Sequence, residues 1–345
     1  MRTVNYLRFM LQYKVVKALQ NPKAYDVKIR KIKLLQTHIS YIFLTGKYAY
    51  KIKKPVNFGF LDFTTLENRK FYCEEELRLN RRLCGDMYVS VLPITLSGGV
   101  IKINGAGEVV EYVLKMKEIP QNAMMSQLLN ANKVDKNDMD KIAETLFHFH
   151  NNAETSDEID KFGSLETIKF NWDENFNQTR EFIGRTVSVE DFAFINQKVN
   201  HFMDEKKILF EDRVNKGKIR DCHGDLHSAN IFITDKPCLF DAIEFNKRFR
   251  YADVASDIAF LTMDLGFLGR KDLAEYFLFR YLNHNCDKEL LNILPFYECY
   301  RAFVRGKVMS FKLNDSNITE VDKIDSEKSA CKYFDLSVEY AKKLS

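Results

Sequence analysis

Hydrophobic and polar residues alternate with a strand period through the first third of the chain. Short alternating runs rich in aromatic and β-branched residues predict β-strands. The runs are residues 28–34, 41–44 and 48–53, followed by three more between 88 and 116 that are separated by glycine turns. A helical pattern opens the chain, and another extends from about Thr65 to Leu83. These patterns predict an α+β unit of roughly five strands with a helix inserted after the third.

Beyond Pro120 the hydrophobic period becomes helical almost everywhere. The predicted helices are residues 123–130, 137–152, 165–183, 188–207, 254–265, 271–284, 287–313 and 321–343. The exception is 220–245, where the runs IFIT and CLFDAI flank a turn. We therefore predict two domains. Residues 1–117 form a small N-lobe with an antiparallel sheet, and residues 118–345 form a larger, mainly helical C-lobe.

Composition narrows the class of protein. The 345 residues include 46% hydrophobic residues, enough for a substantial core, and the net charge is only +4. So small a basic excess argues against a nucleic-acid partner. No run of eighteen apolar residues occurs, so a membrane span is not expected. Seven cysteines without a CxxC pair predict reduced thiols and a cytoplasmic location.

The segment CHGDLHSAN, residues 222–230, concentrates polar side chains that do chemistry. On a strand, His223, Asp225 and His227 would face one way and could ligate zinc, but Gly224 is a poor strand residue. A structural loop with side chains bonded to its own backbone explains one such residue and not the whole set. A third reading is a loop that transfers phosphate.

The spacing of three residues carries the phosphoryl-transfer reading. An aspartate can orient and deprotonate a hydroxyl, while an asparagine five residues later and a further aspartate hold Mg²⁺. Asp225, Asn230 and Asp241 have this order, with His223 at the head of the loop. Asp225 is the predicted base, and Asn230 and Asp241 are the predicted metal ligands. The reading requires a strand lysine and a helix glutamate in the first domain.

Both required residues are present. Lys51 lies in the third predicted strand, where it can reach nucleotide phosphates, and Lys53 shares its strand face. The following helix carries Glu74, Glu75 and Glu76 as partners. We favour Lys51 with Glu76, while the choice among these residues stays open.

Taken together, these segments resemble a known family. HGDLHSAN and LFDAIEF resemble the catalytic core of the aminoglycoside phosphotransferase and choline kinase branch of the protein-kinase-like fold. TGKYAYKIKKPVNFGFLDF and EEELRLNRRL extend the similarity to a bacterial family of aminoglycoside-phosphotransferase-like proteins, from about residue 30 to 310. The resemblance implies ATP and Mg²⁺ as cofactors and assigns the same roles to Lys51, Asp225, Asn230 and Asp241.

The resemblance also implies roles for further residues. Asp257 matches the aspartate that braces the catalytic loop, and backbone groups between Met116 and Ile119 are expected to bind adenine. The phosphate-covering turn departs from the glycine-rich pattern of protein kinases, because it reads Gln36-Thr-His-Ile-Ser40. The hydroxyls of Thr37 and Ser40, or the backbone amides of the turn, are candidate phosphate contacts there, with turn capping by the hydroxyls as the equal alternative.

The predicted reaction is transfer of the γ-phosphoryl group of ATP to a hydroxyl of a small-molecule acceptor. His227, Arg301 and Arg305 are candidate acceptor contacts, since a guanidinium suits a phosphate or carboxylate; internal salt bridging is the competing reading for the arginines. Two alternatives stay open, namely a non-catalytic nucleotide-binding regulator and a nucleotidyl transferase on the same fold. His148 and His150, on a helix near the loop, are expected to be structural.

Overall fold

The chain forms two compact units in the computed structural model, which describes residues 2–285, 287–315 and 318–344. The first unit comprises Met1–Met124 together with the later segment Cys238–Lys247. The second unit comprises Met125–Pro237 and Arg248–Ser345. The segment that carries Asp241 therefore packs with the N-terminal sheet, although it lies far along the sequence. The predicted boundary between residues 117 and 118 stays a prediction.

A six-stranded antiparallel sheet forms the body of the first unit, in the order β1-β2-β3-β6-β4-β5. The strands are β1 Lys33–Gln36, β2 Ser40–Leu44, β3 Tyr48–Lys53, β4 Tyr88–Ser97, β5 Val100–Ile103 and β6 Glu108–Lys117. The first strand begins later than predicted. Ile29 and Ile32 pack on the core without joining the sheet, so these apolar positions mark burial rather than strand pairing.

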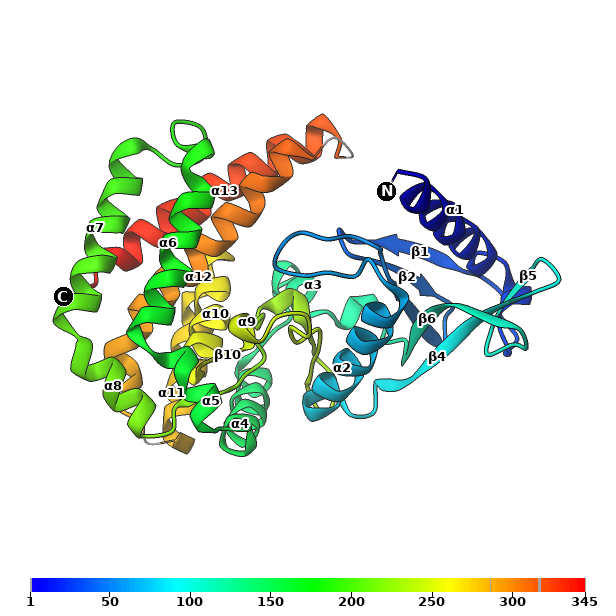
Figure 1. Ribbon diagram of the computed structural model, residues 1–345. Coiled ribbons are helices and arrows are strands. Elements are labelled where there is room, and N and C mark those ends of the chain that lie inside the picture. The colour runs from blue at the N-terminus through cyan, green and yellow to red at the C-terminus, as the bar shows by residue number, and fades with distance from the viewer. Residues whose placement is uncertain (1, 286, 316–317, 345) are drawn as a thin grey trace. The chain divides into compact units, whose positions relative to one another are not determined.

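Two helices cover opposite faces of this sheet (Figure 1). Helix α1, Arg2–Leu19, packs on the face that presents Ile52. Helix α2, Leu66–Cys84, lies on the other face, where Lys51 and Lys53 point. Successive residues of a strand face opposite ways, so β3 buries apolar side chains on one face and delivers both lysines to the other.

The cysteine expectation was wrong for one pair. Cys84, the last residue of α2, is disulfide-bonded to Cys238, the first residue of β9 (Cys238–Leu239). The two cysteines are 154 residues apart, so no local spacing could reveal the pair. The bond ties the segment that carries Asp241 to the end of α2.

Helices dominate the second unit, as predicted (Figure 1). The main helices are α3 Met125–Asn130, α4 Lys136–Asn152, α6 Leu165–Thr179, α7 Val189–Glu205, α10 Val254–Phe267, α11 Lys271–Asn285, α12 Leu290–Phe311 and α13 Glu320–Ala341. Three helices went unpredicted, namely α5 Asp157–Asp160, α8 Lys207–Asn215 and α9 Lys247–Arg250. Strands β7 (Ile219–Asp221) and β10 (Tyr251–Asp253) pair antiparallel and lead into the 222–230 loop and α10.

Among the described residues, no helix has the length and hydropathy needed to cross a bilayer.

Candidate active site

Both strand lysines of the first unit bind the same glutamate. Lys51 Nζ lies 2.7 Å from Oε1 of Glu76, and Lys53 Nζ lies 2.8 Å from Oε2. Glu76 belongs to the buried stripe of α2, whereas Glu74 pairs with Lys70 on the exposed side of that helix. The sequence left open which lysine pairs with the glutamate, and in the structure both do. The helix phase, which buries Glu76, selects that partner.

Two acids from the segment Cys238–Lys247 extend the cluster. Oδ1 of Asp241 lies 2.7 Å from Lys51 Nζ, and Glu244 is ion-paired to Lys53. Asn80 of α2 holds this segment, because its Oδ1 accepts the backbone N–H of Ala242 at 2.9 Å. Glu244 is therefore a buried partner of Lys53 and not an exposed residue at the end of a strand.

The charges in this cluster do not balance. Two lysines face three carboxylates, which leaves an excess of one negative charge. Burial opposes ionisation of Glu76, but Lys51 and Lys53 outweigh it and lower the pKa of Glu76 to about 2. Asp241 is the exposed end of the chain of ion pairs, with 42% of its side chain accessible, whereas Glu76 and Lys53 are 1% accessible. A cation would therefore be attracted to Asp241.

In the second unit, the 222–230 loop is held from behind by Asp257 of α10. Its two carboxylate oxygens accept the backbone N–H groups of His223 at 2.7 Å and Gly224 at 2.9 Å. Gly224 has a φ of 85°, a conformation that glycine adopts without strain. Arg301 of α12 donates to the carbonyl oxygen of Gly224 at 2.9 Å. The backbone just before Asp225 is thus fixed by hydrogen bonds on both sides.

Asp225 and Asn230 are in direct contact within this loop. Nδ2 of Asn230 donates to Oδ2 of Asp225 and to its backbone oxygen, both at 2.9 Å. Nε2 of His227 lies 3.5 Å from the same carboxylate oxygen. Burial raises the pKa of Asp225, but His227, Arg305 and His223 outweigh it and hold that pKa well below its usual range. Asp225 is therefore ionised at neutral pH.

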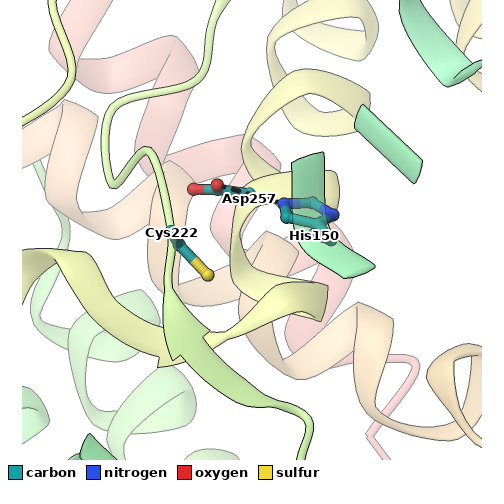
Figure 2. Close-up of side chains that lie close together, drawn as sticks. All are labelled: His150, Cys222 and Asp257. Atoms are coloured by element: carbon teal, nitrogen blue, oxygen red, sulfur yellow. Dashed lines mark hydrogen bonds and ion pairs between the residues drawn. The ribbon is translucent and has the colours of Figure 1, made fainter. Parts of the chain in front are cut away.

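Three buried side chains that could ligate a metal ion lie close together behind the loop, as Figure 2 shows. They are His150 of α4, Cys222 after β7 and Asp257 of α10. Their ligand atoms lie within 4.8 Å of one another. The three already have partners, because His150 bonds to Asp257 at 3.3 Å and to Tyr281 at 2.8 Å, and Cys222 donates to a backbone oxygen. This set supports Asp257 rather than presenting an open metal site.

The zinc reading finds no support in the loop. Nδ1 of His223 accepts the backbone N–H of Asp225 at 3.2 Å, and Nδ1 of His227 accepts that of Ala229 at 3.3 Å. Within the described ranges, the one group of candidate metal donors is the set drawn in Figure 2, which contains neither residue. His227 instead packs against the ring of Phe260.

The predicted nucleotide contacts lie at two places in the first unit. In the covering turn, the hydroxyl of Thr37 caps the backbone N–H of Ser40 at 3.0 Å, and Ser40 itself is buried. Met116 sits inside β6, paired with Ala49 and Tyr88, whereas Ile119 lies beyond the strand end. Thr37 therefore has the capping role that the sequence offered as an alternative.

Curated proteins similar to this chain come from mycobacteria. An uncharacterised protein of Mycobacterium tuberculosis H37Rv is 35% identical over 278 residues, which is 80% of this chain and 54% of that protein. An uncharacterised protein of Mycobacterium bovis matches to the same extent. This chain thus spans about half the length of the curated relatives it matches. No family model matches it.

Solved structures with a similar backbone are small-molecule kinases. A choline/ethanolamine kinase family protein from Mesorhizobium loti superposes with a TM-score of 0.55 at 10% identity, covering 96% of this chain and 99% of that one. This chain has the protein-kinase-like fold. A microcompartment-associated aminopropanol kinase gives a TM-score of 0.52 at 13% identity, with the same coverage. The kinase-like fold predicted from the sequence resemblance is confirmed.

Within this kinase-like fold, sequence reasoning left the role of Glu244 open and assigned no role to Cys222 and Tyr281. Glu244 follows Asp241 in an irregular segment where no periodicity signals burial. Cys222 and Tyr281 join His150 behind the loop; Cys222 opens the CHGDLHSAN segment but was given no role there, and Tyr281 stands in no recognisable motif. The sequence position of Glu244 could have indicated its place in the cluster. It lies three residues after Asp241, a predicted metal ligand, and belongs to the same short segment.

Proposed function

We propose that this chain is an ATP- and Mg²⁺-dependent phosphotransferase that moves the γ-phosphoryl group to a hydroxyl of a small molecule. The observation that carries the proposal is the pairing of Lys51 with Glu76 and Asp241 in the first unit. It is joined by the Asp225–Asn230 contact in the second. The choline/ethanolamine kinase family protein and the aminopropanol kinase support an alcohol as the acceptor.

In this proposal the first unit binds the nucleotide. Lys51 neutralises the phosphates, and Glu76, held by Lys53, keeps Lys51 in place. Backbone groups between Met116 and Ile119 bind adenine, and the turn that ends at Ser40 covers the phosphates through its backbone. The side chain of Ser40 is buried, so we assign the backbone rather than the hydroxyl to this role.

The side chains suit magnesium, a hard cation that prefers oxygen ligands. Asp241 is the accessible end of a cluster with excess negative charge. The Nδ2 atom of Asn230 faces Asp225, so its Oδ1 is the end that can ligate a cation. Asp241 and Asn230 are accordingly the proposed ligands. When bound, Mg²⁺ would neutralise charge on the transferring phosphates.

Asp225 orients the acceptor hydroxyl and takes its proton as the oxygen bonds to phosphorus and ADP departs. Its depressed pKa makes it a weak base, so its main contribution is orientation, with proton transfer late in the step. His223 and Asp257 keep the loop in shape. A cytoplasmic location is part of the proposal.

The test is transfer of label from γ-labelled ATP to a panel of small alcohols. We expect Asp225→Asn and Asp241→Asn each to lower turnover about 10²–10⁴-fold, while Asp235→Asn, in an exposed turn, leaves it unchanged. Retained turnover in Asp225→Asn would refute the assigned chemistry. The mass gained by the acceptor separates the alternatives, since a nucleotidyl transferase adds adenylyl rather than phosphoryl. A regulator binds ATP and modifies nothing.

A further inference from the structure

Arg305 lies one helical turn beyond Arg301 on the face of α12 that contacts the loop. Arg301 is committed to that loop, because it donates to the carbonyl oxygen of Gly224 and to Ser256. Residues four apart project from the same side of a helix, displaced along its axis by roughly 6 Å. Arg305 therefore lies about one helical turn from the contact between Arg301 and Gly224, and the charges of Arg305 and Asp225 interact.

The charged and titratable groups around Arg305 come from several elements. Tyr333 of α13 lies under the guanidinium at 5.5 Å and bonds to it through its hydroxyl. Asp264 of α10 is near enough to interact, but its Oδ2 already accepts the backbone N–H of Ser228 at 2.8 Å. Burial and the charge of Arg305 together lower the pKa of Lys312, so two cations lie close together here.

The guanidinium of Arg305 is incompletely satisfied. Its Nε is shielded from solvent and has no hydrogen-bond partner among the residues that the structure describes. Buried donors in folded proteins are nearly always paired, and leaving one unpaired is unfavourable. Loop support does not explain the residue, because Arg301 and Asp257 already hold the backbone. A donor in this position, whose charge interacts with that of Asp225, is suited to an oxygen anion supplied by a ligand.

We infer that Arg305 binds an anionic group on the acceptor, so that the acceptor is an alcohol bearing a carboxylate or a phosphate. The inference rests on the proposed function, because it assigns Asp225 to the acceptor hydroxyl. A guanidinium matches the paired oxygens of either anion. A protonated amine placed beside Arg305 would be repelled. The acceptor class thus differs from an amino alcohol.

The experiment compares matched alcohols that differ by an anionic group: glycerol with glycerol 3-phosphate and with glycerate, and glucose with glucose 6-phosphate. Ethanolamine represents the cationic class. We expect the anionic members to be the better acceptors. Arg305→Met should lower kcat/KM for them by about 30-fold or more, as loss of one buried charge contact implies. Arg305→Lys keeps the positive charge but lacks the paired N–H groups of the guanidinium. Its kcat/KM for the anionic acceptors should lie between those of the wild type and Arg305→Met.

Two controls separate binding from folding. Arg185 is an exposed arginine paired with Glu327, so Arg185→Met should leave every acceptor unchanged. Tyr333→Phe keeps the ring under Arg305 and removes the hydroxyl, and circular dichroism checks that each variant is folded. The affinity for ATP, measured by calorimetry, should be equal in wild type and Arg305→Met, because the proposed nucleotide contacts lie in the first unit. A loss of ATP affinity in Arg305→Met would place Arg305 on the nucleotide and overturn the inference.

Direct binding distinguishes failure of this inference from failure of the proposed function. Titration calorimetry with inorganic phosphate should show binding that Arg305→Met removes. If phosphate binds through Arg305 and no alcohol is phosphorylated, the anion site stands and the phosphotransferase proposal fails. If ethanolamine is the preferred acceptor, the phosphotransferase proposal stands and the anion site is refuted. Absence of phosphate binding also refutes the anion site.

Discussion

Replacing Lys53 by methionine tests how the buried cluster of the first unit is stabilised. Methionine keeps most of the volume of the lysine stem, so the change removes charge with little cavity. Glu244 loses its partner, and one oxygen of Glu76 loses its donor; Lys53 and Glu76 are each 1% accessible. Removing one partner of a buried ion pair destabilises by about 3–5 kcal/mol, because the remaining charge is left without compensation. We expect that loss at pH 7.

The loss should depend on pH in a defined direction. Burial already raises the pKa of Glu244, and without Lys53 that pKa rises further. When the pKa of an acid is higher in the folded state than in the unfolded state, its protonated form stabilises the folded state at low pH. This stabilisation is lost as the pH rises above the pKa of the unfolded state. The deficit of Lys53→Met should therefore shrink on acidification. The double variant Lys53→Met/Glu244→Gln should be more stable than the two separate effects predict, by about 1–3 kcal/mol.

Urea unfolding measured with two probes gives the answer. Far-ultraviolet circular dichroism reports both units, whereas Trp172, the single tryptophan, is buried in α6 and reports the second unit. The shift should appear in the dichroism and leave the Trp172 fluorescence transition in place. The matched variant Lys51→Met should destabilise less, because Asp241 is 42% accessible and stays hydrated. A change below about 1 kcal/mol in Lys53→Met would refute the reasoning.

Three further predictions concern α12. Burial raises the pKa of Glu298 from 4.5 to about 7, so stability should fall by about 3 kcal/mol as pH rises across that interval, and Glu298→Gln should remove this slope in urea titrations. Burial lowers the pKa of Lys307 from 10.5 to about 8, so stability should rise with pH between those values, and the rise should vanish in Lys307→Met. In Gly306→Ala the new Cβ would lie 2.9 Å from the ring of Phe334, and urea unfolding should show a loss of about 1–3 kcal/mol.

Periodicity explains which parts of the site could be predicted. Strand alternation in YAYKIK puts Lys51 and Lys53 on one face, and the helical period of α2 places Glu76 in a buried stripe with Cys73 and Asn80. Both arguments use only local geometry, so they succeed wherever an element is regular. The resemblance supplied the rest of the fold, since no local rule relates β3 to a segment almost 200 residues later.

Contacts made by irregular segments could not be predicted in the same way. Glu244 and Cys238 lie in a stretch with little regular structure, and their partners come from β3 and α2. Arg301 was a candidate acceptor contact because its residue type suits anions, with internal salt bridging as the competing reading, and it donates to the backbone of the loop. Residue type identifies what a side chain can bind. The packing of α12 decides that Arg301, and not Arg305 one turn later, is already hydrogen-bonded to the loop backbone.

Each half of the proposed reaction is organised inside its own unit. In the first unit, Glu76 orients Lys51 while the Cys84–Cys238 bond and Asn80 hold the segment of Asp241. In the second, Asp257 fixes the backbone that presents Asp225. Preorganised groups need little rearrangement during a reaction, which lowers its barrier. The geometry of each set therefore depends on contacts within a single compact unit, so damage to one set should leave the other intact.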